Sequence, residues 1–312
     1  MENVNLSTSL VGVKLRNPLV LASGIVDTTA SALVYALKNG AGAVIIKSIS
    51  PEPRPGHKEP ILHAIGKDSM INAVGLSNPG MELGAEEIKQ AKARTKEPII
   101  ANIVAFTVKD FGICAKTISK GNPDLIEVNM SCPNVDDEHG KPFACDPELA
   151  AQVTKEVKAN TNIPIIVKLS PNVANITVIA KAVEKAGADA ITCINTIGGM
   201  VIETKTTQPL ISNKVGGLSG AAIKPVAVKA IYECYKAVNI PILGTGGVTT
   251  GNDAIEQLMA GAVAVGIGTA VYTRGIEVFD KINKEIEEFM QENNYSTISE
   301  LIGLAHKKEN KQ

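Results

Sequence analysis

The stretch NIPIIVKLSPNVANITVIAKAVEKAGADAITCIN, residues 162–195, predicts a strand, a helix and a second strand. Its first apolar run, PIIVKL (164–169), is opened by a proline and has the length of a buried strand. The segment 173–186 then repeats apolar residues with helical spacing, and Gly187 ends it. A second apolar run, AITCIN (190–195), follows at once. This order favours a parallel sheet that is covered by helices.

The same unit recurs along the chain in two alternating forms. One form ends a helix with Gly or Asn before an apolar strand, as in NGAGAVII, GNPDLIEV, KAGADAITC and MAGAVAVGIG. The other opens the strand with proline, as in KEPIIANI, NIPIIVKL and NIPILGTG. With a first strand of its own kind, the expected strands are 18–22, 43–47, 98–103, 125–130, 164–169, 190–195, 241–246 and 262–268. Eight such units predict an α/β fold, the closed (β/α)8 TIM barrel, which typically takes ~250 residues. A doubly wound open sheet is the alternative, and we expect residues 1–312 to form a single domain.

The segments outside the repeats locate the two ends of this barrel. The alternating VNLSTSLVGVKL before the first strand predicts an N-terminal β-hairpin that caps the barrel floor. Long insertions follow strands 2, 4 and 6, at 48–80, 131–146 and 196–222. All three leave the carboxyl ends of their strands, which is the face where such barrels build active sites.

Composition excludes several classes of function. The 31 basic and 32 acidic residues give a net charge of −1, so no global field attracts nucleic acid or an anionic membrane. Aromatic residues are 3% of the chain, too few for a platform that stacks bases. No signal peptide and no apolar run of ~18 residues is visible, so we expect a cytoplasmic protein without a membrane segment. The five cysteines show no disulfide framework and no zinc or iron–sulfur spacing, so no metal is expected.

Polar residues stand at the carboxyl ends of these apolar strands. Each one alone is most often a solvated strand end, but their gathering on a single face favours a ligand site. They are Ser23, Lys47, Ser48, Asn102, Asn129, Lys168, Asn195, Thr196 and Thr269.

Glycine-rich turns follow strands 7 and 8. GTGGVTTG (244–251) and GIGTA (266–270) leave backbone N–H groups open to a ligand, and a helix begins soon after each. Ordinary tight turns are the simpler interpretation. The loops after strands 7 and 8, however, are where barrels of this type bind phosphate.

Two lysines among these residues admit two chemistries. Lys47 or Lys168 could lose its proton in an apolar barrel and form a Schiff base. Either could instead stay charged and stabilise negative charge on a cofactor or substrate. The amides of Asn72, Asn78, Asn129 and Asn195 suit a planar ring with alternating C=O and N–H groups, such as a pyrimidine that carries a carboxylate.

One cysteine is the candidate proton-transfer group. Cys132 lies three residues beyond Asn129 in a long loop, and a thiol needs only a modest pKa shift to act as a base near neutral pH. Packing beneath the loop is the alternative. No Asp, Glu or His stands at an expected strand end. Cys193 lies within a strand and Cys114 and Cys234 on helices, so we expect these three in the core, and we assign no role to Cys145.

Six ordered motifs resemble the dihydroorotate dehydrogenase family, and the match extends from about residue 15 to residue 270. They are NAVGLSNPG (72–80), NMSCPNV (129–135), VKLSPNV (167–173), NTIGGM (195–200), GGLSGAAIKPVA (216–227) and GTGGV (244–248). Within this family the chain is most similar to class 1, whose members use Cys as the base. Within class 1 the loop HGKPFACDPELAAQVTKEVK is more similar to the NAD-linked class 1B catalytic subunit than to the fumarate-using class 1A form.

The resemblance implies an FMN cofactor and a set of residues for each ligand. FMN would contact Ser23, Lys47, Ser48, Asn102, Asn129, Lys168, Ile194, Gly220, Gly246, Gly247, Gly268 and Thr269. Dihydroorotate would contact Lys47, Asn72, Ala73, Val74, Gly75, Leu76, Asn129, Asn195 and Thr196. Cys132 would remove the C5 proton while C6 delivers a hydride to the flavin, which gives orotate in pyrimidine biosynthesis.

The resemblance also implies a partner. No strand–GxGxxG–helix unit and no cysteine set for a cluster is present, so electrons would leave through a partner subunit with FAD and a [2Fe–2S] cluster that reduces NAD⁺. A homodimer within a heterotetramer is expected. One departure concerns the first strand, which reads ASGIVDTTAS where the family commonly has a Gly–Thr–Phe–Gly-like turn. The alternatives are a fumarate-reducing class 1A enzyme and a Schiff-base lyase on the same barrel.

Overall fold

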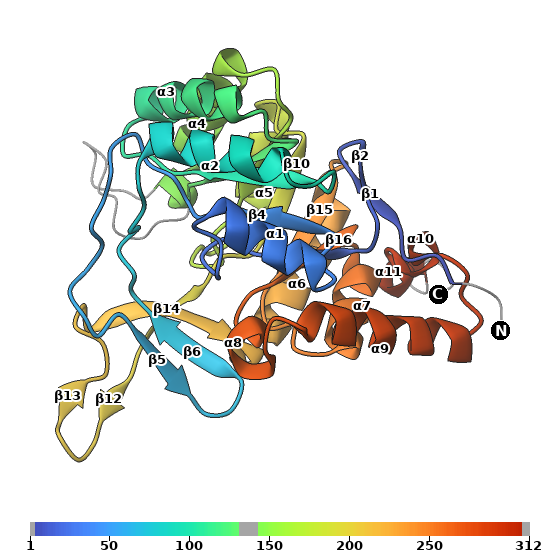
Figure 1. Cartoon of the computed structure of the whole chain (residues 1–312). Helices are drawn as coiled ribbons and strands as arrows, with labels where there is room; N and C mark the ends of the chain where they lie inside the picture. Colours follow the sequence, from blue (N-terminus) through green and yellow to red (C-terminus); the bar gives the residue numbers. More distant parts are fainter. Residues whose placement is uncertain (1–3, 131–142, 308–312) are drawn as a thin grey trace.

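Eight parallel strands close into a barrel in the computed structural model, which describes residues 4–130 and 143–307 (Figure 1). In barrel order they are β3 (Leu19–Leu21), β4 (Ala43–Ile45), β7 (Ile99–Ile103), β8 (Leu125–Asn129), β9 (Ile165–Lys168), β10 (Ala190–Cys193), β15 (Ile242–Thr245) and β16 (Ala264–Ile267). Pairing of β16 with β3 closes the ring. The predicted TIM barrel is confirmed, with a strand at each of the expected positions.

The two repeat forms have a physical basis at the start of the strands. Proline has no N–H to donate, but its carbonyl joins the ladder, as Pro164 shows by accepting from Ile126 of β8. The first N–H of the proline-opened strand β9, at Ile165, donates to Asp189, which precedes β10 (2.8 Å). Asp124, before β8, accepts from the first residue of β7 in the same way (2.7 Å). Neighbouring strands of opposite form therefore complete each other's hydrogen bonds.

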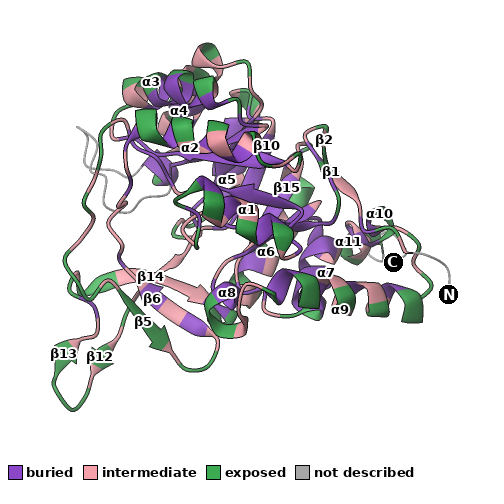
Figure 2. Ribbon diagram, viewed as in Figure 1, coloured by how far each residue is buried: buried purple, intermediate pink, exposed green. Residues whose placement is uncertain are grey.

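Helices surround the barrel, with their apolar faces against the strands (Figure 2). They are α1 (Ala30–Lys38), α2 (Met81–Lys92), α3 (Val108–Ile118), α4 (Pro147–Asn160), α5 (Ile176–Lys185), α6 (Lys224–Ala237), α7 (Gly251–Ala260), α8 (Ala270–Arg274) and α9 (Val278–Glu292). The helix expected from residue 173 begins at Ile176, because the Asn175 side chain accepts from the N–H of Thr177 and caps it. Short helices α10 (Ile298–Leu301) and α11 (Leu304–Lys307) follow α9. Among the described residues, no helix is both long and apolar enough to span a membrane.

An N-terminal hairpin closes the floor of the barrel. Strands β1 (Thr8–Leu10) and β2 (Val13–Leu15) pair antiparallel, as the alternating sequence predicts. Leu10 and Leu15 are completely or almost completely buried, and they pack with inward-facing strand residues such as Val20, Ile100 and Ile166. The interior at this end is therefore a dry aliphatic plug.

The insertions at the opposite end form structure that the sequence did not predict. Strands β5 (Leu62–Ile65) and β6 (Ser69–Asn72), from the insertion after the second barrel strand, join β11 (Ile197–Met200) and β14 (Val215–Gly220) from the insertion after the sixth. A small hairpin, β12 (Ile202–Glu203) and β13 (Gln208–Pro209), projects beside them, far from the floor hairpin (Figure 1). Strands β11 (IGGM) and β14 (VGGLSG) are rich in glycine, and β6 pairs with β14 across about 145 residues of sequence, so no local periodicity signals the sheet. Most of the insertion after the fourth strand lies outside the described residues.

Candidate active site

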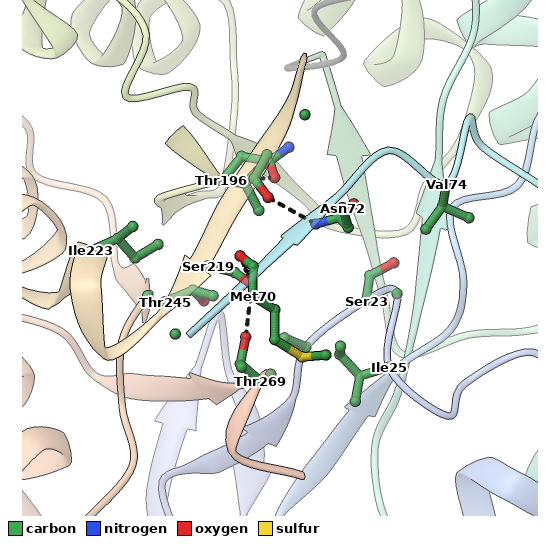
Figure 3. Close-up of a pocket in the computed structure, with 18 of the residues that line it drawn as sticks. Ser23, Ile25, Met70, Asn72, Val74, Thr196, Ser219, Ile223, Thr245 and Thr269 are labelled. Atoms are coloured by element: carbon green, nitrogen blue, oxygen red, sulfur yellow. Dashed lines mark hydrogen bonds between the residues drawn. The ribbon is translucent and has the colours of Figure 1, made fainter. Parts of the chain in front are cut away.

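A cavity of about 720 Å³ opens between the carboxyl ends of the barrel strands and the four-stranded sheet (Figure 3). Cavities of this size are typical of small-molecule and cofactor sites. The residues expected from the sequence that line it are Ser23, Lys47, Ser48, Asn72, Ala73, Val74, Gly75, Leu76, Asn129, Lys168, Ile194, Asn195, Thr196, Gly220, Gly246, Gly247, Gly268 and Thr269. The fold thus brings residues from every part of the chain to one place.

Three residues singled out from the sequence are not in this lining. Cys132 lies outside the described residues. Asn102 is fully buried, and its amide donates to the carboxylate of Glu127 (2.5 Å) instead of facing the cavity. The expectation that Asn78 offers its amide to a ring is wrong, because its side chain accepts from the N–H groups of Ser50 and Gly80 and donates to Leu76. Asn78 therefore holds the loop that carries Leu76, and its side-chain donors and acceptor already have hydrogen-bond partners.

A buried carboxylate at the base of the cavity escaped the sequence analysis. Glu127, in the middle of β8, is fully buried. One of its oxygens accepts from the Lys168 ammonium (3.5 Å) and the other from the Thr192 hydroxyl (2.6 Å). Its sequence signal is a Glu inside the otherwise apolar run LIEVNM (125–130), away from the strand end. The contact gives the Lys168 ammonium a buried carboxylate partner, as an ion pair in an apolar interior requires.

The second lysine of the cavity has no such contact. Among the described residues, no carboxylate oxygen lies within 4.0 Å of the Lys47 ammonium. Burial lowers the pKa of Lys47, the negative charge of Asp27 opposes this, and Lys168 adds to the lowering. Lys47 is therefore the cation of the cavity that is available to an anionic ligand.

Asp27 is the second acidic residue that the sequence analysis missed. It lies in the ASGIVDTTAS turn, is almost fully buried, and accepts a hydrogen bond from the N–H of Gly24. Burial raises the pKa of Asp27 from 3.8 to about 6, while Lys47 and nearby backbone N–H groups pull it down. Asp27 thus lies in the turn that departs from the family pattern.

Amide and hydroxyl groups link the strand ends around the cavity. The Asn129 amide donates to the Ser48 hydroxyl (3.2 Å), and the Asn195 amide donates to the Asn129 oxygen (3.4 Å). From the four-stranded sheet, the Asn72 amide donates to the carbonyl of Gly217 (3.2 Å), beside Thr196 in Figure 3. These groups come from separate elements, so only the closed barrel with its sheet presents them together.

The glycine turns after β15 and β16 form a cradle. Gly246 and Gly247 have φ values of +130° and +78°, and a Cβ on Gly247 would lie 2.5 Å from the Cβ of Lys224. Within the described ranges, the backbone N–H groups of Gly246, Gly247, Gly268 and Thr269 donate to no other residue. At one side the Thr269 hydroxyl donates to Ser219 of β14 (2.8 Å, Figure 3). Converging backbone donors of this kind suit a phosphate.

The described thiols do not provide a base. Cys114, Cys193 and Cys234 are buried in the core, as the sequence predicted, and Cys145 is exposed. Burial raises the pKa of Cys114 to about 12 and also raises that of Cys145. In Cys193 a contact with Cys234 and burial both raise the pKa. None of these three thiols is shifted toward the thiolate.

Comparison with known proteins decides the family. The family model for dihydroorotate dehydrogenase matches residues 5–290. The chain belongs to the dihydroorotate dehydrogenase family. A protein of Methanothermobacter thermautotrophicus is 44% identical over 302 residues, which cover 96% of this chain and 98% of that protein. One of Thermoplasma acidophilum is 44% identical, covering 96% and 99%, and one of Methanocaldococcus jannaschii is 42% identical, covering 98% and 100%. All three are named dihydroorotate dehydrogenase B (NAD(+)), catalytic subunit.

Proposed function

We propose that this dihydroorotate dehydrogenase is the catalytic subunit of an NAD⁺-linked enzyme that oxidises (S)-dihydroorotate to orotate in pyrimidine biosynthesis. The observation that carries the proposal is the cavity, which gathers the residues of the six family motifs around a phosphate cradle and a cation. Relatives of matching length are named for the same reaction.

The cavity has the groups that FMN requires. The backbone donors of Gly246, Gly247, Gly268 and Thr269 would hold its phosphate. Lys168, which is paired with Glu127, would stabilise negative charge on the ring. When bound, FMN would supply the redox chemistry by accepting a hydride from C6 of dihydroorotate. The remaining proposed contacts that line the cavity are Ser23, Ser48 and the backbone of Ile194. The hydroxyl oxygens of the two serines lie 3.5 Å apart.

The substrate would bind between Lys47 and the amides. Lys47 would pair with the carboxylate of dihydroorotate, because no carboxylate in the described part of the chain contacts it. Asn72, Asn129 and Asn195 would bind the C=O and N–H groups of the ring, as neutral amides both donate and accept. The segment 73–76 and Thr196 would complete the wall.

Cys132 is the proposed base. Its thiolate would take the C5 proton as the hydride leaves C6, so that the C5–C6 single bond becomes the double bond of orotate. Of the five cysteines, it is the one placed in the NMSCPNV motif of the family.

The reduced site requires an outlet for its electrons. The relatives are named as catalytic subunits, which implies a separate partner. We propose that this chain forms a homodimer within a heterotetramer, and that a partner with FAD and a [2Fe–2S] cluster passes electrons to NAD⁺. A cytoplasmic location is proposed with it.

Activity of the purified chain tests this proposal. The chain loaded with FMN should form orotate from dihydroorotate with an artificial electron acceptor, followed by the ultraviolet absorbance of orotate. NAD⁺ should serve as acceptor only when the partner subunit is added. Rapid turnover with fumarate by the chain alone would instead support the class 1A form. Absence of orotate with every acceptor, although FMN is bound, would contradict the proposal.

A second candidate function rests on the lowered pKa of Lys47. A lysine with a lowered pKa is also the nucleophile that a Schiff-base lyase needs. Borohydride trapping distinguishes the two. Irreversible attachment of a carbonyl substrate to Lys47 would favour the lyase, whereas we expect none.

A further inference from the structure

The turn between β3 and α1 places a buried carboxyl group behind the substrate cation. We propose that Asp27 is a positioning residue: its carboxylate sustains the charge of the Lys47 ammonium without contacting it, and the charge state of Asp27 in turn sets how tightly the cavity binds the carboxylate of the ligand. This inference rests on the proposed function and adds a residue to that site. No family motif named above includes Asp27.

Asp27 is fixed by the turn that it closes. Its carboxylate accepts from the N–H of Gly24, and its backbone carbonyl accepts from the N–H of Lys47 (3.2 Å). Gly24 has a φ of +100°, and a Cβ there would lie 3.7 Å from the Lys47 ammonium. The same short turn therefore touches the backbone and approaches the charged end of Lys47.

Asp27 acts from behind the cavity. It is 2% exposed and does not line the cavity, whereas Gly24 and Ile25 of the same turn do. A ligand in the cavity therefore meets the turn and Lys47, and Asp27 influences the ligand through Lys47.

The Asp27–Lys47 pair differs from the Glu127–Lys168 pair in the distance between its charges. Lys168 is in contact with Glu127 at 3.5 Å, so its donors are partly occupied. No carboxylate oxygen of a described residue comes within 4.0 Å of the Lys47 ammonium. Because Coulomb attraction falls slowly with distance while a hydrogen bond requires contact, Asp27 can sustain the charge of Lys47 and leave its N–H groups for a ligand.

Asp27 and the charged groups that face it should make the binding of an anionic ligand depend on pH in two ranges. They are Lys47 after β4, Tyr272 on α8, whose pKa is raised by burial and by Asp27, and, through Lys47, Lys168 on β9. Below the pKa of Asp27, about 6, the carboxyl group is neutral, so the cavity is more positive and should bind an anion more tightly. At alkaline pH, Asp27 should delay the loss of the proton from Lys47.

Orotate binding to the FMN-loaded chain tests the proposal. Isothermal titration calorimetry from pH 5 to 10 should show the dissociation constant rising on the order of tenfold between pH 5 and 7, and rising again at alkaline pH. In Asp27→Asn, which keeps the shape and a hydrogen-bond acceptor, the acid step should vanish and the alkaline rise should begin about one pH unit lower. An Asp27→Asn profile that matches the wild type would overturn the inference. Wild-type chain that holds FMN but binds no orotate at any pH would contradict the proposed function itself.

Three variants control for other titrating groups. His57, whose ring packs against Gly75 of the cavity wall, belongs to a residue type that changes charge in this range, so His57→Gln should retain the acid step. Tyr272→Phe should retain the alkaline rise. Glu288→Gln, on an exposed site of α9, should change neither.

If Asp27→Asn fails to bind FMN, the protons taken up when the wild-type chain binds orotate provide a second test. Orotate binding should raise the pKa of Asp27 and draw a proton from the buffer near pH 6 in the wild type. Titrations in buffers of different ionisation enthalpy measure this uptake. Absence of uptake near pH 6, or an equal uptake in Asp27→Asn, would overturn the inference.

Discussion

The two ends of the barrel are made by the same eight strands, but they differ in the polarity of their buried side chains and in the presence of a cavity. At the floor, Leu10 and Leu15 of the hairpin pack on inward-facing Val, Ile, Leu and Ala side chains. At the opposite end, the interior holds Glu127, Lys168 and Asn102, and a cavity opens above them. A dry plug can be built by any well-packed apolar set, whereas the polar end requires each group to find a partner or a ligand. The floor therefore contributes packing and no chemistry, whereas the cavity end holds the groups that can act on a ligand.

Loss of the proposed base should produce the largest effect. Cys132→Ala should lower the rate of orotate formation by ~10²–10⁴-fold, because the substrate proton loses its acceptor. FMN content and the midpoint of thermal unfolding should remain those of the wild type. Full activity in this variant, measured by steady-state assay at neutral pH, would remove Cys132 from the mechanism.

Loss of packing at the floor should lower the stability of the protein and leave its activity unchanged. Leu15→Ala should lower the free energy of unfolding by about 3 kcal/mol, because a buried side chain at 1% exposure leaves a cavity that the hairpin cannot fill. Denaturant titration measures this loss. Activity per folded molecule should be unchanged, and a fall in that activity at full FMN occupancy would show that the two ends are not independent.

Removal of a charge from the cavity end should stabilise the protein. The pKa of Asp27 rises from 3.8 in the unfolded chain to about 6 in the fold, so the folded state binds the extra proton between these values. Stability therefore falls as pH rises through this window. Asp27→Asn should raise the free energy of unfolding by about 3 kcal/mol at pH 7, and most of this gain should be lost near pH 4. An equal effect at both pH values, measured by urea unfolding, would contradict the assigned titration.

The exposed thiol should have the smallest effect. Cys145, next to the Asp146 cap of α4, donates a long hydrogen bond to the carbonyl of Asn172 (3.8 Å). Cys145→Ala should change the rate of orotate formation by less than about twofold and stability by less than about 0.5 kcal/mol. A large loss of rate would mean that the catalytic thiol was assigned to the wrong residue.

The same contrast explains how far the sequence could be interpreted. The barrel was predictable because each unit repeats a local pattern, with proline or glycine before an apolar run. The floor hairpin was predictable from its alternation. The sheet of β5, β6, β11 and β14 was not, because glycine-rich strands such as β14 pair with segments far away in the sequence.

The site was predictable to the extent that its residues stand at strand ends. Lys47, Lys168, Asn129 and Asn195 all line the cavity. Glu127 and Asp27 were missed, because one lies inside a strand and the other in a turn, and both matter through burial beside a lysine. Burial of a charge depends on the three-dimensional fold, and local sequence carries little sign of it.

Anaerobic reduction tests the central claim that one cavity brings FMN and dihydroorotate together. One equivalent of dihydroorotate should be added to the purified, FMN-loaded chain without the partner subunit or any acceptor. The account predicts that the visible absorbance of the flavin disappears and that one orotate forms per flavin. Flavin absorbance that stays unchanged while FMN remains bound would contradict it.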